Sequence, residues 1–548
     1  MTETKTPAVP AALGGNPWQG KTVHDALAHA VSRWPDHEAL VDGDTVLTFR
    51  ELSAARDRLA VALSKRGIAN ATHVAVHLRR SWEHVVLLHA LWQLGAVVIT
   101  LNTAWESEEL AYALTSTEAQ FLVTSTHVAG KPVDHRMAAL GLPAYGPADS
   151  SPFPLLQAVI SDDPDASPHE WSLQSWLRSE AGRAPDPVRN QDAVILFTSG
   201  STARPKGVVI RQEGLLGSAH YFMERLGLGP DDRFLGLGQY FHAGGLVQLL
   251  GTCLYGTSMH IFDGFQPEAM AQAVHERGLT ATTGFDLVLG RLWDDLERKG
   301  WHRPSKVGCA PGLTMYDRLE AEGATVVMMY AMSEAANMVT LTEPRLGSEK
   351  GRMSNGRPLP GVTVRICDPA SGAPLPAGTP GEICFTGWNL FSRYYGAPDL
   401  TRESFDDEGF FHTGDYGWLD ENGRLYYRGR YSSMIKTGGE NVSETEVESF
   451  LVREISDVVA AAVVGIPDTR WGEAVVAFVE LRPGAAFDPA ALRRACRGRI
   501  AGYKIPKRFL PIAPTEWPTT PMGKLLRKEL RQTAIEQTGG EIAAHLGS

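Results

Sequence analysis

Residues 198–207 read Thr-Ser-Gly-Ser-Thr-Ala-Arg-Pro-Lys-Gly, and this run is the most informative stretch of the chain. It follows residues 193–197, Ala-Val-Ile-Leu-Phe, whose unbroken apolar character predicts a buried strand. The run is therefore a polar, glycine-bearing loop that leaves a sheet. Successive backbone amides in such a loop can converge on a phosphate, and hydroxyls and a lysine add donors and positive charge. It is not a Walker A loop, because Lys206 stands between Pro205 and Gly207.

Four further motifs follow in order along the chain. They are Tyr-Ala-Met-Ser-Glu at residues 330–334, Phe-His-Thr-Gly-Asp at residues 411–415, Gly-Arg-Tyr-Ser-Ser-Met-Ile-Lys-Thr-Gly-Gly-Glu-Asn-Val-Ser-Glu-Thr-Glu-Val-Glu at residues 429–448, and Thr-Thr-Pro-Met-Gly-Lys-Leu-Leu-Arg at residues 519–527. Together with the loop they resemble the motifs of the adenylate-forming superfamily, which contains acyl-CoA synthetases, peptide-synthetase adenylation domains and luciferases. The resemblance covers residues 22–532 and is closest to the acyl-CoA ligases.

Length and composition set limits on the class of protein. A chain of 548 residues is too long for one compact core and corresponds to about three to four domain-sized units. Its net charge of −11 argues against a nucleic-acid partner. The cysteines are scattered without a Cys-x-x-Cys spacing, which favours a reduced, intracellular protein; they are Cys253, Cys309, Cys367, Cys384 and Cys496.

The sequence predicts a cytoplasmic enzyme without a membrane span. The N-terminus lacks the apolar core of a signal peptide. The most apolar stretch, residues 85–101, is interrupted by His89, Gln93 and Gly95. A buried helix followed by a buried strand is the better interpretation of that stretch.

The fold class expected is α/β. Strand-like runs at residues 73–78, 96–101 and 121–124 alternate with helical spacing, which indicates largely parallel, layered sheets. Thr48 is placed to cap a helix, with Glu51 as the reciprocal partner. Residues 142–190 read as an irregular surface excursion with only short helical patches around residues 173–179, because Pro, Asp, Ser and Gly are frequent there.

Three regions are expected along the chain. Residues 1–21 form an N-terminal tail, and residues 22–430 form a large acyl- and adenylate-binding domain that ends in a β-rich subdomain at residues 381–427. Residues 431–548 form a small α+β domain, which the resemblance implies is mobile about a hinge near Ser432. The family usually has Asp or Lys at that hinge position.

The resemblance implies a two-step reaction. A carboxylate attacks the α-phosphate of ATP to give an acyl-adenylate and pyrophosphate, and the thiol of coenzyme A then displaces AMP. The phosphates would be surrounded by Thr198, Ser199, Gly200, Ser201, Thr202 and Lys206. Glu334 would bind Mg²⁺, Ser333 would offer its hydroxyl to the α-phosphate, and Lys524 would bridge the carboxylate and phosphate oxygens.

The same resemblance assigns the nucleoside. Asp415 accepts hydrogen bonds from the ribose hydroxyls and Arg430 adds donors. Tyr330 packs against adenine, with Ala310 and Pro311 in the loop on its other face. The competing interpretation of Asp415 and Arg430 is a surface ion pair.

His242 is expected beside the substrate carboxylate. Peptide-synthetase adenylation domains have an Asp at the matching position, as counter-ion to an α-amino group, so an amino acid is disfavoured here. The expected acyl pocket consists of Phe241, Gly244, Gly245, Thr283, Gly284, Phe285, Gly308, Met329 and Ala331. Several of these residues are small and none is charged, which predicts a sizeable apolar acid.

The thiol side is expected in the C-terminal region. Lys436, Gly438 and Gly439 line the route of the pantetheine arm in related enzymes. Lys504, with Lys507 and Arg508, is a candidate for the phosphates of CoA, and a solvated basic face is the equal alternative.

Ala203 departs from the family pattern, which has Gly at this position in the phosphate loop. A methyl group there could hinder a positive φ and the approach of amides to the β- and γ-phosphates. Gln212 replaces a His that often follows the loop, and Ala331 replaces a second glycine. One hypothesis is therefore that adenylation is impaired and that the chain acts on an acyl-AMP made by a partner enzyme. The alternative is an ordinary two-step ligase.

Other functions stay open at this point. A stand-alone adenylating enzyme that loads a carrier protein is the main alternative. A degenerate nucleotide-binding protein is disfavoured by the intact Glu334, Asp415, Arg430 and Lys524. A luciferase-type oxygenase is more distant still.

Overall fold

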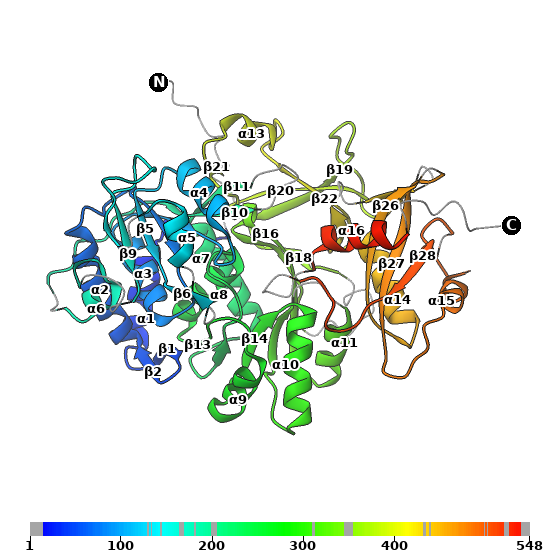
Figure 1. Ribbon diagram of the computed structural model, residues 1–548, viewed down its shortest axis with the longest axis horizontal. Helices are drawn as coiled ribbons and strands as arrows, with labels where there is room; N and C mark the ends of the chain where they lie inside the picture. The colour runs from blue at the N-terminus through cyan, green and yellow to red at the C-terminus, as the bar shows by residue number, and fades with distance from the viewer. Residues whose placement is uncertain are drawn as a thin grey trace.

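The computed structural model describes residues 15–128, 131–132, 134–142, 145–163, 169–179, 182–198, 205–309, 313–344, 354–430, 434–437, 440–468, 470–497, 499–500, 502–519 and 525–538 (Figure 1). Over these residues the chain forms two large sheets, a smaller antiparallel sheet, a separate C-terminal sheet and a two-stranded pair of β6 (His127–Val128) and β7 (Lys131–Pro132).

The first large sheet has the strand order β21-β11-β10-β4-β3-β5-β9-β8. Its strands are β3 (His73–His77), β4 (Val97–Thr100), β5 (Phe121–Thr124), β8 (Gly146–Pro147), β9 (Ala158–Ser161), β10 (Asp192–Thr198), β11 (Lys206–Arg211) and β21 (Arg393–Tyr394). The central pairs β10·β4, β4·β3, β3·β5 and β5·β9 are parallel, whereas β10 and β11 are antiparallel. The phosphate-loop motif therefore joins the two strands of a hairpin.

The second large sheet has the order β18-β17-β16-β15-β14-β12-β13-β1-β2. Its strands are β1 (Glu38–Asp42), β2 (Thr45–Thr48), β12 (Arg233–Leu235), β13 (Ser258–Ile261), β14 (Ala281–Gly284), β15 (Lys306–Cys309), β16 (Thr325–Met332), β17 (Asn337–Leu341) and β18 (Arg357–Pro358). Between them the chain carries α7 (Gln212–Leu226), α8 (Ala243–Tyr255), α9 (Pro267–Arg277), α10 (Asp286–Arg298) and α11 (Leu313–Ala321). The largest buried cluster joins α7 and α8 to apolar residues of both sheets.

Helices of the N-terminal half complete these layers. They are α1 (Val23–Arg33), α2 (Phe49–Ser64), α3 (Trp82–Gln93), α4 (Ser107–Ser116), α5 (Asp134–Ala139) and α6 (Leu173–Leu177). The side chain of Thr48 caps α2 and the carboxylate of Glu51 bonds back to the Thr48 amide, which confirms the expected capping box. Stretch 85–101 is confirmed as a buried helix and strand, α3 and β4. Among the described residues, no helix combines the length and apolarity that crossing a membrane requires.

The β-rich subdomain is an antiparallel sheet of β19 (Val362–Cys367), β20 (Gly381–Gly387), β22 (Phe411–Leu419) and β23 (Leu425–Arg430), in that order. Strand β22 contains a wide irregularity opposite β20. Glu382 pairs with Tyr416 and Cys384 with His412, so three residues of β22, 413–415, stand against the single residue 383. Extra residues on one strand form a bulge that redirects side chains.

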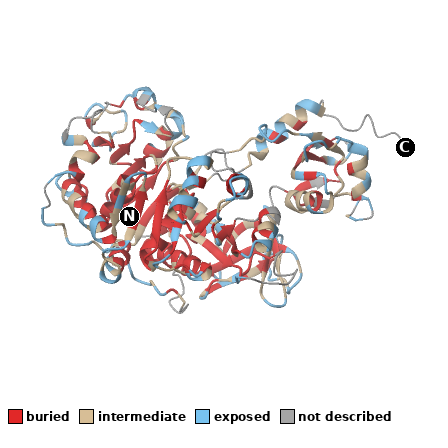
Figure 2. Ribbon diagram, turned by 90° about the horizontal axis from the view of Figure 1, so that it is seen from below, coloured by how far each residue is buried: buried red, intermediate tan, exposed pale blue. Residues whose placement is uncertain are grey.

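The C-terminal region has its own sheet and core. Strands β24 (Ile435–Thr437), β25 (Glu440–Val442), β26 (Val458–Asp468), β27 (Gly472–Leu481) and β28 (Arg508–Pro511) are accompanied by α14 (Glu444–Glu454), α15 (Pro489–Cys496) and α16 (Arg527–Thr538). Figure 2 shows a buried centre in this region, apart from the large buried interior of the N-terminal part. The α/β class and the smaller C-terminal α+β unit are thus confirmed.

One expectation about the fold is wrong. Residues 142–190 are not irregular throughout, because β9 lies inside the first sheet next to β5 and is fully buried. The strand is short and flanked by Pro, Ser and Asp, so its four residues give little periodic signal.

Candidate active site

Three strand ends and the bulge of β22 supply the residues of the candidate site. Thr198 ends β10 and pairs with Lys206, the first residue of β11. Tyr330 lies near the end of β16, and the short helix η2 (Ser333–Ala335) follows directly with Ser333 and Glu334. The bulge in β22 presents Asp415. Ser199, Gly200, Ser201, Thr202 and Ala203 lie outside the described residues.

Asp415 is the centre of a buried cluster. The pairing of β22 with β23 places Asp415 opposite Arg430, and Arg430 Nε lies 3.3 Å from Asp415 Oδ1. The hydroxyl of Tyr330 donates a hydrogen bond of 2.6 Å to Asp415 Oδ2. Burial raises the pKa of Asp415 to about 6, although Arg430 and the Tyr330 hydroxyl both act to lower it. The sequence-predicted nucleoside residues are therefore brought together.

The second carboxylate oxygen of Asp415, Oδ1, can still accept a hydrogen bond. Asp415 is only 5% exposed, and its Oδ1 receives no hydrogen bond from the described residues. The contact with Arg430 is an ion pair without hydrogen-bond geometry. Because buried carboxylate oxygens normally have donors, this atom is suited to hydroxyl groups of a ligand.

Tyr427 contributes to this cluster and had no signal in the sequence. Its ring lies 5.5 Å from that of Tyr330, at an interplanar angle of 33°. Burial and the neighbouring Asp415 raise the pKa of Tyr330, so its hydroxyl stays protonated and remains a donor.

Tyr394 connects the phosphate-loop lysine with the metal-binding candidate. Its hydroxyl donates to Glu334 Oε1 at 3.0 Å, and Lys206 Nζ lies 5.2 Å from the centre of its ring. Burial, together with Glu334, raises the pKa of Tyr394. A carboxylate beside a lysine in this arrangement suits Mg²⁺ and phosphate oxygens together. Sequence reasoning missed Tyr394, because nothing in the two-residue strand β21 indicates which residue its hydroxyl contacts.

The acid-side candidates lie at the ends of neighbouring strands. Thr283 pairs with Gly308, and Met329 and Ala331 follow on β16, two strands from β14. His242 occupies the N-cap position of α8, and its ring lies 4.8 Å from that of Phe241. Phe285 is 38% exposed.

The glycines of the expected acyl pocket need a correction. A Cβ at Gly245 would lie 2.1 Å from the Gln239 carbonyl oxygen, and one at Gly308 would lie 2.7 Å from the Phe222 ring. A Cβ at Gly284 would lie 3.2 Å from Leu289. A side chain at these positions would meet protein atoms, so packing accounts for the glycines. Their presence is therefore no evidence of a large acyl pocket. Gly244 has more room, with Asn337 at 3.6 Å.

The expectation that Gln212 acts near the phosphates of ATP also needs a correction. Its side-chain oxygen accepts a hydrogen bond from the Val23 amide at 2.7 Å, and its amide group donates to the Asn190 carbonyl at 2.6 Å. Gln212 is fully buried. It therefore ties α7 to the start of α1, and its side chain is not free to handle phosphates.

The thiol-side candidates are described in part. Lys436 lies on β24, and its side chain is outside the described residues, as are Gly438, Gly439, Ser432, Ala310, Pro311 and Lys524. Lys504 Nζ donates to Glu446 Oε1 at 2.7 Å, so this ammonium group already has a carboxylate partner. Lys507 Nζ lies 4.8 Å from the Trp471 ring centre, and the Arg470 guanidinium lies 5.0 Å from the same ring.

Comparison with known proteins gives a consistent result. A family model described as AMP-binding enzyme matches residues 27–395, and one described as AMP-binding enzyme C-terminal domain matches residues 446–524. A 2-succinylbenzoate–CoA ligase of Bacillus cereus is 32% identical over 510 residues, which is 92% of this chain and 96% of that protein.

Solved structures agree with the sequence relatives. The structure of ATP-bound MatB from Rhodopseudomonas palustris has a TM-score of 0.79 at 29% identity, covering 93% of this chain and 98% of that one. O-succinylbenzoate CoA synthetase (MenE) from Bacillus subtilis, in complex with the acyl-adenylate intermediate OSB-AMP, has a TM-score of 0.76 at 26% identity, covering 92% and 97%. The chain belongs to the AMP-binding enzyme family, the adenylate-forming superfamily, and is an acid–thiol ligase within it.

Proposed function

We propose that this enzyme uses ATP and Mg²⁺ to activate a hydrophobic, non-amino carboxylic acid as its acyl-adenylate and then transfers the acyl group to coenzyme A. The observation that carries the proposal is the buried Asp415 carboxylate: Tyr330 holds one oxygen, and the other receives no hydrogen bond from any residue that the structure describes. A ribose offers two adjacent hydroxyls that fit this acceptor and the nearby Arg430. The relatives named as CoA ligases support the same reaction.

The first half-reaction requires cations beside the phosphates. Glu334 would hold Mg²⁺ with the help of the phosphates themselves, since Mg²⁺ commonly uses one or two carboxylates in nucleotide sites. Lys206, placed over the Tyr394 ring, would face the same phosphates. Lys524 is proposed to reach the reacting carboxylate, as the resemblance implies. The substrate carboxylate bonds to the α-phosphorus, the bond to the bridging oxygen breaks, and pyrophosphate leaves with its electron pair.

The second half-reaction requires a thiol route and an anchor for CoA. Lys436, Gly438 and Gly439 are proposed along the pantetheine arm, with movement of residues 431–548 about Ser432 between the two steps. For the nucleotide end of CoA, Trp471 flanked by Arg470 and Lys507 offers an aromatic face and positive charge. That cluster suits CoA better than Lys504, whose charge is paired with Glu446. The thiol loses its proton to solvent, its sulfur bonds to the acyl carbon, the bond from that carbon to the phosphate oxygen breaks, and AMP leaves with the electron pair.

The acid is proposed to be apolar, for example a medium-chain, aryl or polycyclic carboxylate. His242 offers no carboxylate for an α-amino group, which argues against amino acids. The support from small pocket residues is weaker than the sequence indicated, because Gly245, Gly284 and Gly308 are filled by protein atoms. Phe241 and Phe285 remain as apolar candidates at the acid side.

Two alternative functions involve a partner protein: an enzyme that supplies acyl-AMP, or a carrier protein that accepts the acyl group. Impaired adenylation, with acyl-AMP supplied by a partner enzyme, was inferred from Ala203, Gln212 and Ala331. Ala203 lies outside the described residues, and Gln212 is engaged with Val23 and Asn190, so that inference now depends on Ala203 and Ala331. We therefore favour the ordinary two-step ligase over an enzyme that depends on acyl-AMP from a partner. The run Gly-Gly-Glu-Asn-Val at residues 438–442 favours free CoA over a carrier protein as the acceptor. ATP and CoA are cytoplasmic, so the reaction is expected there.

The test separates the half-reactions. The purified protein is incubated with ATP, Mg²⁺ and a panel of apolar acids, and acid-dependent pyrophosphate exchange is measured. CoA is then added, and the thioester is identified by mass spectrometry. Exchange and thioester together support the proposal. Thioester formed only from synthetic acyl-adenylates would overturn the adenylation step, and no product in either assay would overturn the function. A clear preference for acetate or an amino acid would overturn the acid class.

A further inference from the structure

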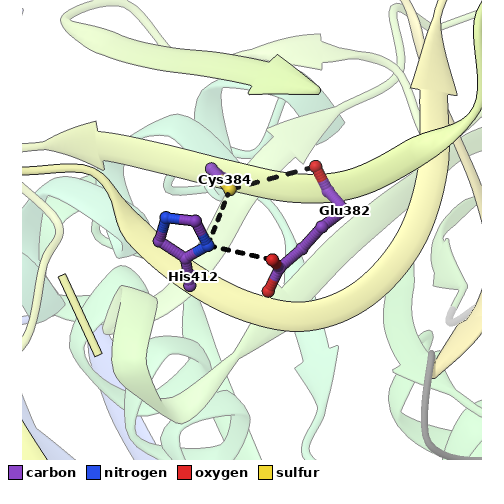
Figure 3. Close-up of side chains that lie close together, drawn as sticks. All are labelled: Glu382, Cys384 and His412. Atoms are coloured by element: carbon purple, nitrogen blue, oxygen red, sulfur yellow. Dashed lines mark hydrogen bonds and ion pairs between the residues drawn. The ribbon is translucent and has the colours of Figure 1, made fainter. Parts of the chain in front are cut away.

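Three side chains of different chemistry meet where the bulge of β22 faces β20. Figure 3 shows the His412 ring directed between Cys384 and Glu382. His412 Nδ1 lies 2.9 Å from Glu382 Oε2 and 3.5 Å from Cys384 Sγ. The other ring nitrogen, His412 Nε2, lies 3.5 Å from Asp406 Oδ2. These contacts stand at the bulge of β22, where the Thr-Gly-Asp motif begins.

The bulge creates a hydrogen-bonding problem that side chains solve. Residues 413–415 have no register partners on β20, so their backbone groups must bond elsewhere. The Gly414 amide donates to Glu382 Oε1 at 2.9 Å. The Thr413 hydroxyl donates to the Ile383 carbonyl at 2.6 Å and accepts from the Asp415 amide at 3.0 Å. The backbone of the bulge is therefore fixed by one carboxylate and one hydroxyl.

Of these two side chains, the Glu382 carboxylate contributes more to fixing the bulge than the Thr413 hydroxyl does. One of its oxygens holds the Gly414 amide and the other holds His412, the residues on either side of Thr413. Gly414 has a φ of +70°, a conformation that glycine reaches without strain and that turns the chain toward Asp415. Hydrogen bonds to a charged acceptor are about twice as strong as neutral ones. Without this carboxylate, the Gly414 backbone would be free to shift toward regular β-strand pairing.

We propose that Glu382 is a positioning residue for nucleotide binding: its carboxylate substitutes for the strand partner that the bulge lacks, and so holds Asp415 in the orientation that receives the ribose. The inference rests on the proposed function, because it assumes that Asp415 contacts the ribose hydroxyls. His412 and Asp406 extend the support away from the site.

The same three groups have the residue types of a transition-metal site. Their hydrogen bonds account for both oxygens of Glu382 and for His412 Nδ1 without an ion. Stoichiometric zinc in the purified protein, lost in Cys384→Ser, would overturn the proposed role, because Glu382 would then be a metal ligand.

The decisive experiment compares AMP with 2′,3′-dideoxy-AMP by calorimetric titration. Glu382→Ala is expected to weaken AMP binding about tenfold, as for a lost charged hydrogen bond, and to leave the binding of dideoxy-AMP unchanged. Glu382→Gln keeps an acceptor for Gly414 and a donor for His412, so it should restore most of the affinity. Glu408→Ala removes a nearby exposed carboxylate and is the matched control. It is expected to leave the affinity for both ligands unchanged.

The outcomes separate this inference from the proposed function. If Glu382→Ala weakens the binding of AMP and dideoxy-AMP equally, or weakens neither, the positioning role is wrong. This holds even when Asp415→Ala weakens AMP binding. If Asp415→Ala leaves AMP binding unchanged, the ribose assignment itself fails and this inference fails with it. In the Asp415→Ala background, Glu382→Ala should cause no further loss of AMP affinity, because one residue acts through the other. Thermal unfolding of each variant checks that the protein is folded.

Discussion

Asp415 is expected to reduce the stability of the ligand-free enzyme, and Asp415→Asn tests this expectation. Burial raises the pKa of this carboxyl from 3.8 to about 6. The folded protein therefore holds the proton more tightly than the unfolded chain does, and the ionised form is the less favourable one in the fold. The penalty is absent below the unfolded pKa of 3.8, grows as the pH rises from there to the folded pKa of about 6, and is complete above it.

The size of the effect follows from the shift in pKa. About two pH units, at about 1.4 kcal/mol for each unit, correspond to about 3 kcal/mol at neutral pH. An asparagine at this position keeps the shape and an acceptor for the Tyr330 hydroxyl but carries no charge. The Arg430 ion pair that it loses is already part of the net shift, and the Arg430 side chain is 45% exposed, so its solvent-screened contribution is small.

The assay is thermal unfolding at two pH values, with AMP titration alongside. At about pH 7.5, Asp415→Asn should raise the melting temperature of the N-terminal domain by about 3 °C, and at about pH 5 the gain should fall to about half. AMP binding should weaken strongly in the same variant. A lower melting temperature at neutral pH, or a gain that does not change with pH, would show that ionised Asp415 does not destabilise the fold.

Three other substitutions test separate parts of the site. Tyr394→Phe removes the hydrogen bond to Glu334 and should slow pyrophosphate exchange about tenfold with unchanged AMP affinity; a loss of AMP binding would contradict its placement. Gln212→Ala leaves the Val23 amide without its acceptor and should destabilise the fold by about 1–3 kcal/mol in denaturant titrations, with pyrophosphate exchange preserved. Lys436→Ala should impair thioester formation from a synthetic acyl-adenylate more than it impairs exchange, and equal losses would remove it from the thiol route.

Much of the fold could be predicted from the sequence because its signals are local. The apolar run before Thr198 predicted β10, and the spacing of Thr48 and Glu51 predicted the cap of α2. Asp415 and Arg430 could be named because each lies in a motif. Strand β9 was missed because four residues give too little pattern.

The contacts that arrange the site could not be predicted in the same way. Tyr394 reaches Glu334 across a sequence separation of 60 residues, and no local pattern marks that pairing. Glu382 acquires its role only from the register of β20 against β22. Gln212 was misassigned because nearness to the loop in sequence does not determine which way a side chain points. The glycines of the acid side were misread because the sequence does not say which atoms occupy the space beside them.

The pairing of β21 with β11 has a consequence for how the enzyme is made. Residues 393–394 complete an edge of a sheet whose other strands lie between residues 73 and 211. Until a ribosome has synthesised that segment, β11 is an open strand edge, and such edges readily pair with other chains. Tyr394 also arrives with the same segment, so a nascent chain cannot complete the contact with Glu334 any earlier. The emerging polypeptide thus passes through an aggregation-sensitive interval of more than a hundred residues, and fragments that end before β21 are expected to be insoluble.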